Sequence, residues 1–236
     1  MLFDARGHAR SPSPLQADEY TLSHFVRDFA GVVDASGVEP VISGGLSMGA
    51  AVALEHAIAF PGRVRGLVLS AFPSSGEDER RRAWALGFAQ AIEERGLDAA
   101  GSEFVWGARS RFDPKGAALI RQGFLEHAPH ALAHILRQVL AELASPATLA
   151  PALAGIDVPV LVVVGAKDPE SLEPSTRLAE MLPNAELCVI PEAGHVVNLA
   201  KPSEFNAAVE RFLRDKLGMQ PKPAGSSEAG GNQGEV

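Results

Sequence analysis

Apolar positions along the chain alternate between two spacings. Residues 21–36 carry apolar side chains three and four positions apart, which predicts an amphipathic helix that ends at Gly37. Short apolar runs, as expected for strands of a buried sheet, lie at residues 38–42, 67–71, 159–165 and 186–190. Helical stretches are expected at residues 50–60 and 203–217, and residues 2–11 are expected to be a strand end and a loop. This alternation predicts an α/β fold with a mostly parallel sheet.

The middle of the chain interrupts that alternation. From residue 73 to residue 149 the periodicity is helical, without a convincing strand. Helices are expected at residues 79–94, 102–110, 115–126 and 130–143. We therefore predict a core made of residues 1–72 and 150–217, with residues 73–149 inserted as a helical cap over the crevice of the core. Residues 218–236 are too poor in apolar side chains to fold and are expected to be a disordered tail.

The pentapeptide Gly45-Leu46-Ser47-Met48-Gly49 lies between an expected strand and an expected helix. In that position Gly-x-Ser-x-Gly is the pattern of a nucleophile elbow, a sharp turn that holds the serine hydroxyl out at the end of the strand. Glycine two positions before and two positions after the serine removes Cβ atoms that would clash in such a turn. The alternative is a Gly/Ser-rich loop that fits the pattern by chance, so the remaining candidate residues decide between the two.

The base and the acid that such a serine needs are both present further along the chain. After Ser47, two candidates follow in the order Ser, Asp, His that elbow enzymes use. Asp168 follows the apolar run 159–165, and His195 lies in the loop after the run 186–190. Because the ligand crevice of an open α/β sheet lies at the carboxyl ends of its strands, all three side chains are expected at one edge of the sheet.

Other polar side chains fit these roles less well. Glu170 and Glu173 are alternative acids, but they lie past the turn that holds Asp168. The other histidines lie on expected helices, in a turn or at irregular spacing in the cap: His8, His24, His56, His127, His130 and His134. No set of ligands has metal-binding spacing, so neither a metal nor a cofactor is expected. His134 and Trp106 are candidates for facing a substrate from the cap, with ordinary cap packing as the alternative.

Together these motifs resemble the α/β-hydrolase fold superfamily, in its small-molecule esterase and lactonase branch. The matching segments are residues 4–11, 45–49, 60–69, 158–168 and 194–205. The resemblance covers residues 2–217, more loosely in the middle third, and is nearest in character to 3-oxoadipate enol-lactonase-like enzymes. It implies an N-terminally truncated α/β-hydrolase fold with these roles: Ser47 as nucleophile, Asp168 as orienting acid, His195 as general base and the Met48 amide as one oxyanion-hole donor.

One segment of the family pattern has no match before Asp4. Members of the family carry a hairpin upstream, followed by a strand that ends in a His-Gly loop, and this loop supplies the second oxyanion donor. Here only Met1, Leu2 and Phe3 precede Asp4. We expect either that the natural protein begins further upstream or that the chain is a real truncation with impaired activity. Loss of one oxyanion donor costs on the order of a hundredfold to a thousandfold in turnover.

Composition narrows the class of protein. The chain has 236 residues, 46% of them hydrophobic, which is enough for one domain with a sizeable core. Its formal net charge is −8, and its basic triplet at residues 80–82 is interpreted as a solvated helix face, so no nucleic-acid partner is expected. The single cysteine, Cys188, cannot form an internal disulfide. With no apolar stretch of membrane-spanning length and no signal-peptide pattern, no membrane partner is expected and a cytoplasmic location is the default.

The sequence thus predicts a serine hydrolase of small carboxylic esters or lactones that works through an acyl-enzyme. Its expected partner is a small-molecule substrate, and the oligomeric state is left open. One alternative is a lyase or C–C bond enzyme that uses Ser47 and His195 to abstract a proton. Another is a catalytically silent homologue. The cap is expected to determine which substrate binds, but its sequence does not indicate what that substrate is.

Overall fold

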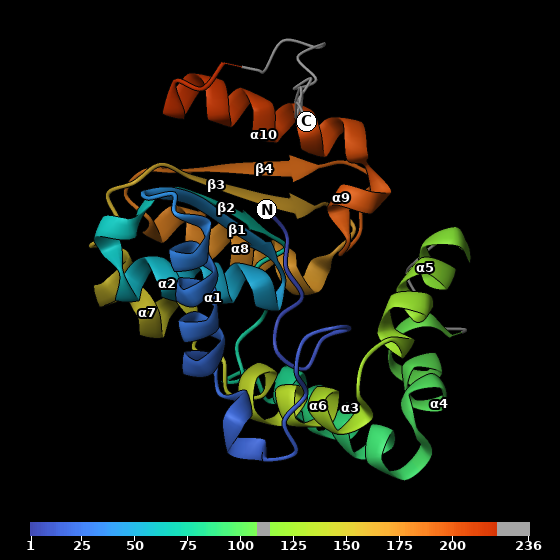
Figure 1. Ribbon diagram of the computed structural model, residues 1–236. Helices are drawn as coiled ribbons and strands as arrows, with labels where there is room; N and C mark the ends of the chain where they lie inside the picture. The colour runs from blue at the N-terminus through green and yellow to red at the C-terminus, as the bar shows by residue number, and fades with distance from the viewer. Residues whose placement is uncertain (108–113, 221–236) are drawn as a thin grey trace, which may run out of the picture.

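The computed structural model describes residues 1–107 and 114–220, and its centre is a parallel sheet (Figure 1). Within the described residues the sheet has four strands: β1 (Val41–Leu46), β2 (Val64–Ser70), β3 (Val160–Gly165) and β4 (Ala185–Ile190). They lie in the order β1-β2-β3-β4, and each neighbouring pair is parallel, which confirms the predicted α/β architecture. All four strands therefore end at the same edge, and the loops after β1, β3 and β4 start there.

Helices cover both faces of the sheet (Figure 1). They are α10 (Pro202–Leu217) on one side, and α1 (Leu22–Ser36), α2 (Met48–Ala59) and α8 (Pro169–Met181) on the other. Leu161 and Val163 of β3 belong to a small core with Phe212 of α10. Val160 and Val162 of the same strand belong to the larger core on the α2 side. Every residue of β3 is buried, as its unbroken apolar run predicts.

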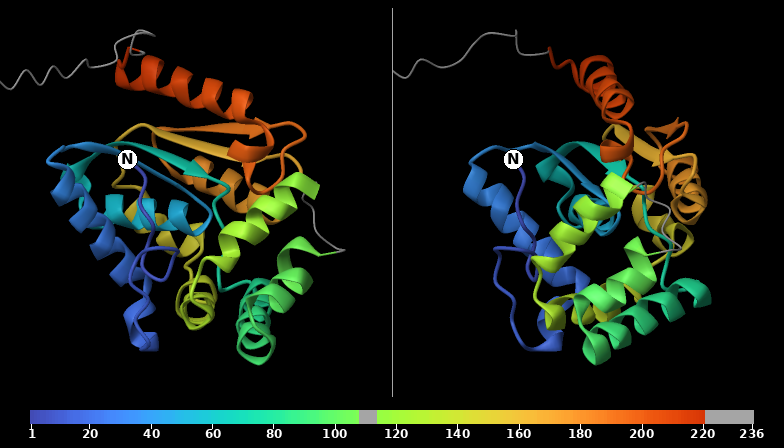
Figure 2. Two further views of the ribbon diagram at one scale, coloured as in Figure 1. Left: turned by 45° about the vertical axis from the view of Figure 1, so that its right-hand side comes forward. Right: turned by 90° about the vertical axis from the view of Figure 1, so that its right-hand side faces the viewer.

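The segment between β2 and β3 folds into helices that gather beside the core, on the side where the strands end (Figures 1 and 2). The helices of this segment, which is the one predicted as a cap, are α3 (Glu79–Arg95), α4 (Leu97–Gly101), α5 (Pro114–Leu125) and α6 (Pro129–Ile135), with π-helical turns at Ser102–Trp106 and Leu136–Leu140. Helix α7 (Pro146–Leu153) leads back to β3, and the predicted boundary between residues 149 and 150 falls inside it. The expected helix at residues 102–110 becomes a π turn, and residues 108–110 lie outside the described part of the chain.

The strand that leads to Ser47 lies later in the chain than the apolar run predicts. Instead of residues 38–42 it comprises Val41–Leu46, which includes one serine and two glycines. Because these residue types have a low strand propensity, the apolar pattern does not reveal the position of this strand. The fold needs at least one of them, because a Cβ on Gly44 would lie 2.8 Å from the carbonyl oxygen of Val68 on β2. Glycine thus allows the two strands to approach closely.

The first residues form no strand, in contrast to the strand end expected there. A groove of about 590 Å³ separates residues 1–3 from β1 and is also lined by Phe29 and Val33 of α1. Among the described residues, the sheet contains no strand formed by residues 1–3. Among the described residues β1 pairs with β2 alone, so the backbone groups on its other side face the groove.

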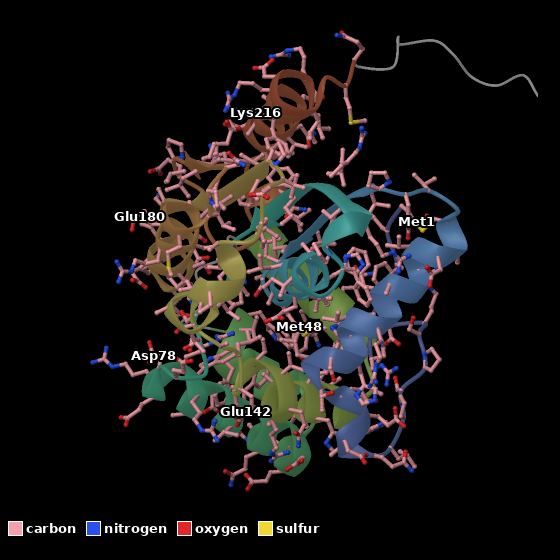
Figure 3. All side chains as sticks on the ribbon, turned by 90° about the vertical axis from the view of Figure 1, so that its left-hand side faces the viewer. Met1, Met48, Asp78, Glu142, Glu180 and Lys216 are labelled. Carbon is pink, nitrogen blue, oxygen red and sulfur yellow. The ribbon has the colours of Figure 1, made fainter. Side chains whose placement is uncertain are left out.

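The molecule is layered from α10 to the cap. Figure 3 shows Lys216 of α10 at one end, Asp78 and Glu142 of the cap segment at the other, and Met48 between them.

No helix within residues 1–107 and 114–220 is long and apolar enough to cross a membrane. Helix α10 ends at Leu217, and Gly218 after it caps the helix in a left-handed conformation with a φ of 64°. The predicted disordered tail lies outside the described residues from residue 221 onward.

Candidate active site

Ser47 lies in a strained turn between β1 and α2. Its φ of 55° and ψ of −118° are sparsely populated by residues other than glycine. The surrounding backbone holds this conformation. The Ser47 N–H donates to the Ser70 carbonyl at 2.9 Å, and the Ser47 carbonyl accepts from the Ala50 N–H at 2.9 Å. This is the strand-to-helix geometry of a nucleophile elbow.

The two glycines of the pentapeptide differ in whether a side chain would fit in their place. A Cβ on Gly45 would overlap the backbone carbonyl of Gly49 and lie 2.8 Å from the Ala50 nitrogen, so glycine alone fits. A Cβ on Gly49 would meet no atom within 4 Å. The expectation that both glycines avoid a clash is therefore right for Gly45 and wrong for Gly49, which faces open space from the first turn of α2.

Asp168 and His195 are in direct contact. The Asp168 Oδ2 atom lies 2.7 Å from His195 Nδ1. Asp168 is 5% exposed, whereas 37% of the His195 side chain is exposed. Burial raises the pKa of the Asp168 carboxyl, but the hydrogen bond and charge of His195, with hydrogen bonding from Ser171, outweigh it and hold the pKa below its usual range. Because the carboxylate is ionised, Nδ1 carries the proton of the bond and Nε2 is left as a proton acceptor.

The loops that carry these two residues are tied together through their backbones. The Lys167 N–H, next to Asp168, donates to the Ala193 carbonyl at 2.8 Å. A Cβ on Gly165, the last residue of β3, would overlap the same Ala193 carbonyl oxygen. Glycine at this position therefore lets the His195 loop pack against the end of β3, within reach of the carboxylate.

The predicted residues all lie just past strand ends at one edge of the sheet. Of the contacts between them, the structure shows the one between Asp168 and His195, and within the described residues the Ser47 hydroxyl has no hydrogen-bond partner. Met48 is the first residue of α2, so its N–H has no intrahelical acceptor and is available to a negatively charged group. No His-Gly dipeptide occurs within residues 1–236, so the described residues identify no donor of that kind.

Ser171 is a residue of this site that the sequence did not reveal. Its hydroxyl oxygen lies 3.2 Å from His195 Nδ1, and the residue is 2% exposed. It lies in the first turn of α8, three residues after Asp168. That spacing puts the two side chains on the same side of a helix start, but the spacing alone marks no functional role for Ser171.

Arg81 departs from the solvated face predicted for residues 80–82. Its guanidinium lies 4.2 Å from the centroid of the Trp84 ring, and within the described residues its buried Nε atom has no hydrogen-bond partner. Burial lowers the pKa of the Arg81 guanidinium, although the nearby carboxylates of Glu170 and Asp168 act to raise it. The solvated-face prediction is therefore wrong for Arg81, because the ring one turn further along α3 attracts the cation inward.

The cap residues considered as substrate contacts have partners within the protein. His134 Nε2 lies 3.2 Å from the carbonyl oxygen of Leu15, and Trp106 packs edge-on against Phe124 with ring centroids 5.5 Å apart. Packing within the cap, the alternative considered from the sequence, describes Trp106, whereas His134 contacts residue 15 of the segment predicted as core. In the part of the chain that the structure describes, no group of three or more His, Cys, Asp or Glu side chains could hold a metal ion.

The parallel sheet with an elbow at its carboxyl edge defines an α/β-hydrolase fold. The model of the alpha/beta hydrolase family matches residues 1–208, so the chain belongs to that family and is an α/β-fold hydrolase, as the sequence resemblance implies.

Among relatives, the chain is 29% identical over 224 residues to 3-oxoadipate enol-lactonase 2 of Acinetobacter baylyi, covering 90% of this chain and 77% of the relative. It is 28% identical over 218 residues to the "Putative 2-succinyl-6-hydroxy-2,4-cyclohexadiene-1-carboxylate synthase" of Bacillus subtilis, covering 89% and 79%. The structure matches that of a thermophilic esterase from Thermogutta terrifontis with a TM-score of 0.75 and 25% identity, covering 90% and 78%.

Proposed function

We propose that this protein hydrolyses small carboxylic esters or lactones with Ser47 as nucleophile, His195 as general base and Asp168 as orienting acid. The observation that carries the proposal is the 2.7 Å contact between the buried Asp168 carboxylate and His195 Nδ1, at the sheet edge where the Ser47 turn lies. An ionised carboxylate in this position fixes the imidazole tautomer that can take a proton at Nε2. A serine nucleophile requires that acceptor.

The proposed reaction has two halves. In the first, His195 takes the hydroxyl proton of Ser47 as the oxygen attacks the substrate carbonyl, and then gives the proton to the leaving oxygen, which leaves an acyl-serine. In the second, His195 takes a proton from water as the water oxygen attacks the acyl-serine carbonyl, and then gives the proton to the Ser47 oxygen as the acid is released. The Met48 N–H donates to the oxyanion in both halves.

A second candidate reaction uses Ser47 and His195 to abstract a proton in a lyase or C–C bond reaction. It is favoured by the identity with the Bacillus subtilis relative, whose name is that of a synthase. A catalytically silent homologue is the third candidate. The three candidates differ in whether an acyl-serine forms and turns over.

The experiment is rapid-mixing hydrolysis of p-nitrophenyl acetate. We expect a burst of p-nitrophenol, close to one equivalent of protein, followed by slower turnover, and we expect neither from Ser47→Ala. Ser43→Ala is the matched control. Ser43 lies on β1 four residues earlier, and its buried hydroxyl has no partner within the described residues, so its removal should keep the burst. Turnover of Ser47→Ala at the unmodified rate would contradict the proposal.

A further inference from the structure

The buried hydroxyl of Ser171 has no task in the mechanism above, yet it lies against the two residues that the mechanism couples. We propose that Ser171 is a positioning residue that fixes the plane of the His195 imidazole relative to the Asp168 carboxylate. This inference rests on the proposed function, because it assigns Ser171 a role in aligning the base of that reaction.

His195 Nδ1 has two oxygen neighbours, the Asp168 carboxylate at 2.7 Å and the Ser171 hydroxyl at 3.2 Å. Hydrogen bonding from Ser171 also helps to keep the pKa of the Asp168 carboxyl low. Because Nδ1 carries the proton, the Ser171 hydroxyl oxygen accepts the longer branch of the Nδ1–H bond. At 2% exposure Ser171 has little access to solvent, so the contact with His195 satisfies its hydroxyl group.

A second oxygen near Nδ1 matters because little else restrains this ring. The His195 side chain is 37% exposed and lies in a loop, so protein packs only part of its surface. A single hydrogen bond fixes a distance but leaves the ring free to tilt about the bond. A second acceptor on a rigid helix also fixes the plane, and with it the direction in which Nε2 points. Ser171 supplies that acceptor from the first turn of α8.

The same helix offers a matched control. Ser175 lies one turn further along α8 and is fully buried. Its hydroxyl accepts the Phe72 N–H at 3.1 Å, so it attaches α8 to the segment after β2. Ser171 and Ser175 thus differ in what their hydroxyls contact, while helix, burial and chemical change on substitution are shared.

The experiment compares Ser171→Ala with Ser175→Ala in the full chain. For Ser171→Ala we expect kcat for p-nitrophenyl acetate to fall about tenfold, the size of one net hydrogen bond, with KM within about twofold. For Ser175→Ala we expect a lower melting temperature and an unchanged kcat. The proton NMR signal of His195 Nδ1–H should move in Ser171→Ala and stay in Ser175→Ala.

Several outcomes would overturn the inference. One is a Ser171→Ala variant with unmodified kcat and an unmoved Nδ1–H signal. Another is an equal loss of kcat in both variants, which would make the Ser171 hydroxyl a packing group. If Ser171→Ala does not fold, Ser171→Cys takes its place, since a thiol fills the site but bonds weakly. The NMR signal needs no substrate, so a signal that moves while Ser47→Ala stays active would support the Ser171 contact and contradict the proposed function.

Discussion

At the scale of single residues, the site depends on Ser47 holding a backbone conformation that serine avoids. A non-glycine residue at such angles costs on the order of 1–3 kcal/mol. Here the bond from its N–H to the Ser70 carbonyl and the two bonds that its own carbonyl accepts at the start of α2 offset that cost. Strain of this kind places the side chain beyond the end of β1, where a substrate can reach it.

The acid assigned to His195 can be tested by exchanging a carboxylate for an amide. Asp168→Asn is expected to lower kcat by about ten-thousandfold, because the amide favours the wrong imidazole tautomer. Glu170→Gln, the same chemical change two residues further on at an exposed position, should keep kcat within a few fold. The measurement is kcat at a mildly alkaline pH. If Glu170→Gln were inactive and Asp168→Asn were active, the orienting acid would be Glu170 instead of Asp168.

Sequence patterns could predict the candidate residues of this site that follow strand ends, and they could not predict the others. Asp168 and His195 each come after an apolar run, so their meeting at one sheet edge follows from parallel topology. Ser171 is an ordinary helix residue in the sequence. Its importance comes from the approach of the His195 loop, which is a tertiary contact. The inward turn of Arg81 likewise depends on the ring of Trp84.

At the scale of elements, the turn from β1 into α2 distinguishes the two motif glycines. Gly45→Ala is expected to lower the melting temperature strongly or to prevent folding, because the added Cβ overlaps backbone atoms that cannot move away cheaply. Gly49→Ala should leave the melting temperature unchanged or raise it. Alanine restricts the unfolded chain, which adds up to about 0.4–1 kcal/mol to the free energy of unfolding where the added Cβ meets no clash. Thermal unfolding followed by circular dichroism measures both. Equal losses in the two variants would contradict this difference.

The strands show why some elements could be predicted and others could not. Strand β3 is buried along its whole length, so its sequence is an unbroken apolar run and its predicted limits are within one residue of the observed ones. Strand β1 is displaced from its prediction, because close contact with β2 requires Gly44 and because its last residues lead into the elbow. Functional and close-packing constraints there replace the residues by which a strand is usually recognised.

At the scale of the whole molecule, burial of histidines links stability to pH. Burial lowers the pKa of His8, His56 and His127. His56 is fully buried between the rings of Phe29 and Phe60, with centroids 4.7 Å and 5.3 Å away. Within the described residues neither of its ring nitrogens has a hydrogen-bond partner, so the folded protein favours the neutral form.

Lowering the pH should therefore destabilise the fold. Below about pH 6.5 these histidines bind protons in the unfolded chain but stay neutral in the folded protein. The free energy of unfolding therefore decreases as the pH falls from about 6.5 toward the lower pKa values of the folded state. We expect a lower melting temperature at about pH 5.5 than at about pH 7.5. In His56→Leu, which removes one such group, this difference should be smaller. An identical pH dependence in His56→Leu would show that His56 does not contribute.

The segment predicted as a cap shows both the strength and the limit of sequence patterns at this scale. Helical periodicity between β2 and β3 predicts a helical insertion, and the described residues of that segment are helical or irregular. The contacts of the cap with the site could not be predicted in this way. They depend on tertiary approaches such as the hydrogen bond from Ser74 of the cap segment to the Glu170 backbone at 2.6 Å.

The central claim is that Ser47 is a nucleophile activated by His195, and covalent labelling tests it most directly. The protein is treated with a fluorophosphonate, and the modified residue is mapped by peptide mass spectrometry. We predict one adduct, on Ser47, that is absent in Ser47→Ala, forms far more slowly in His195→Ala and is retained in Ser43→Ala. An adduct on another residue, or equal labelling of Ser47→Ala and the unmodified protein, would contradict the account.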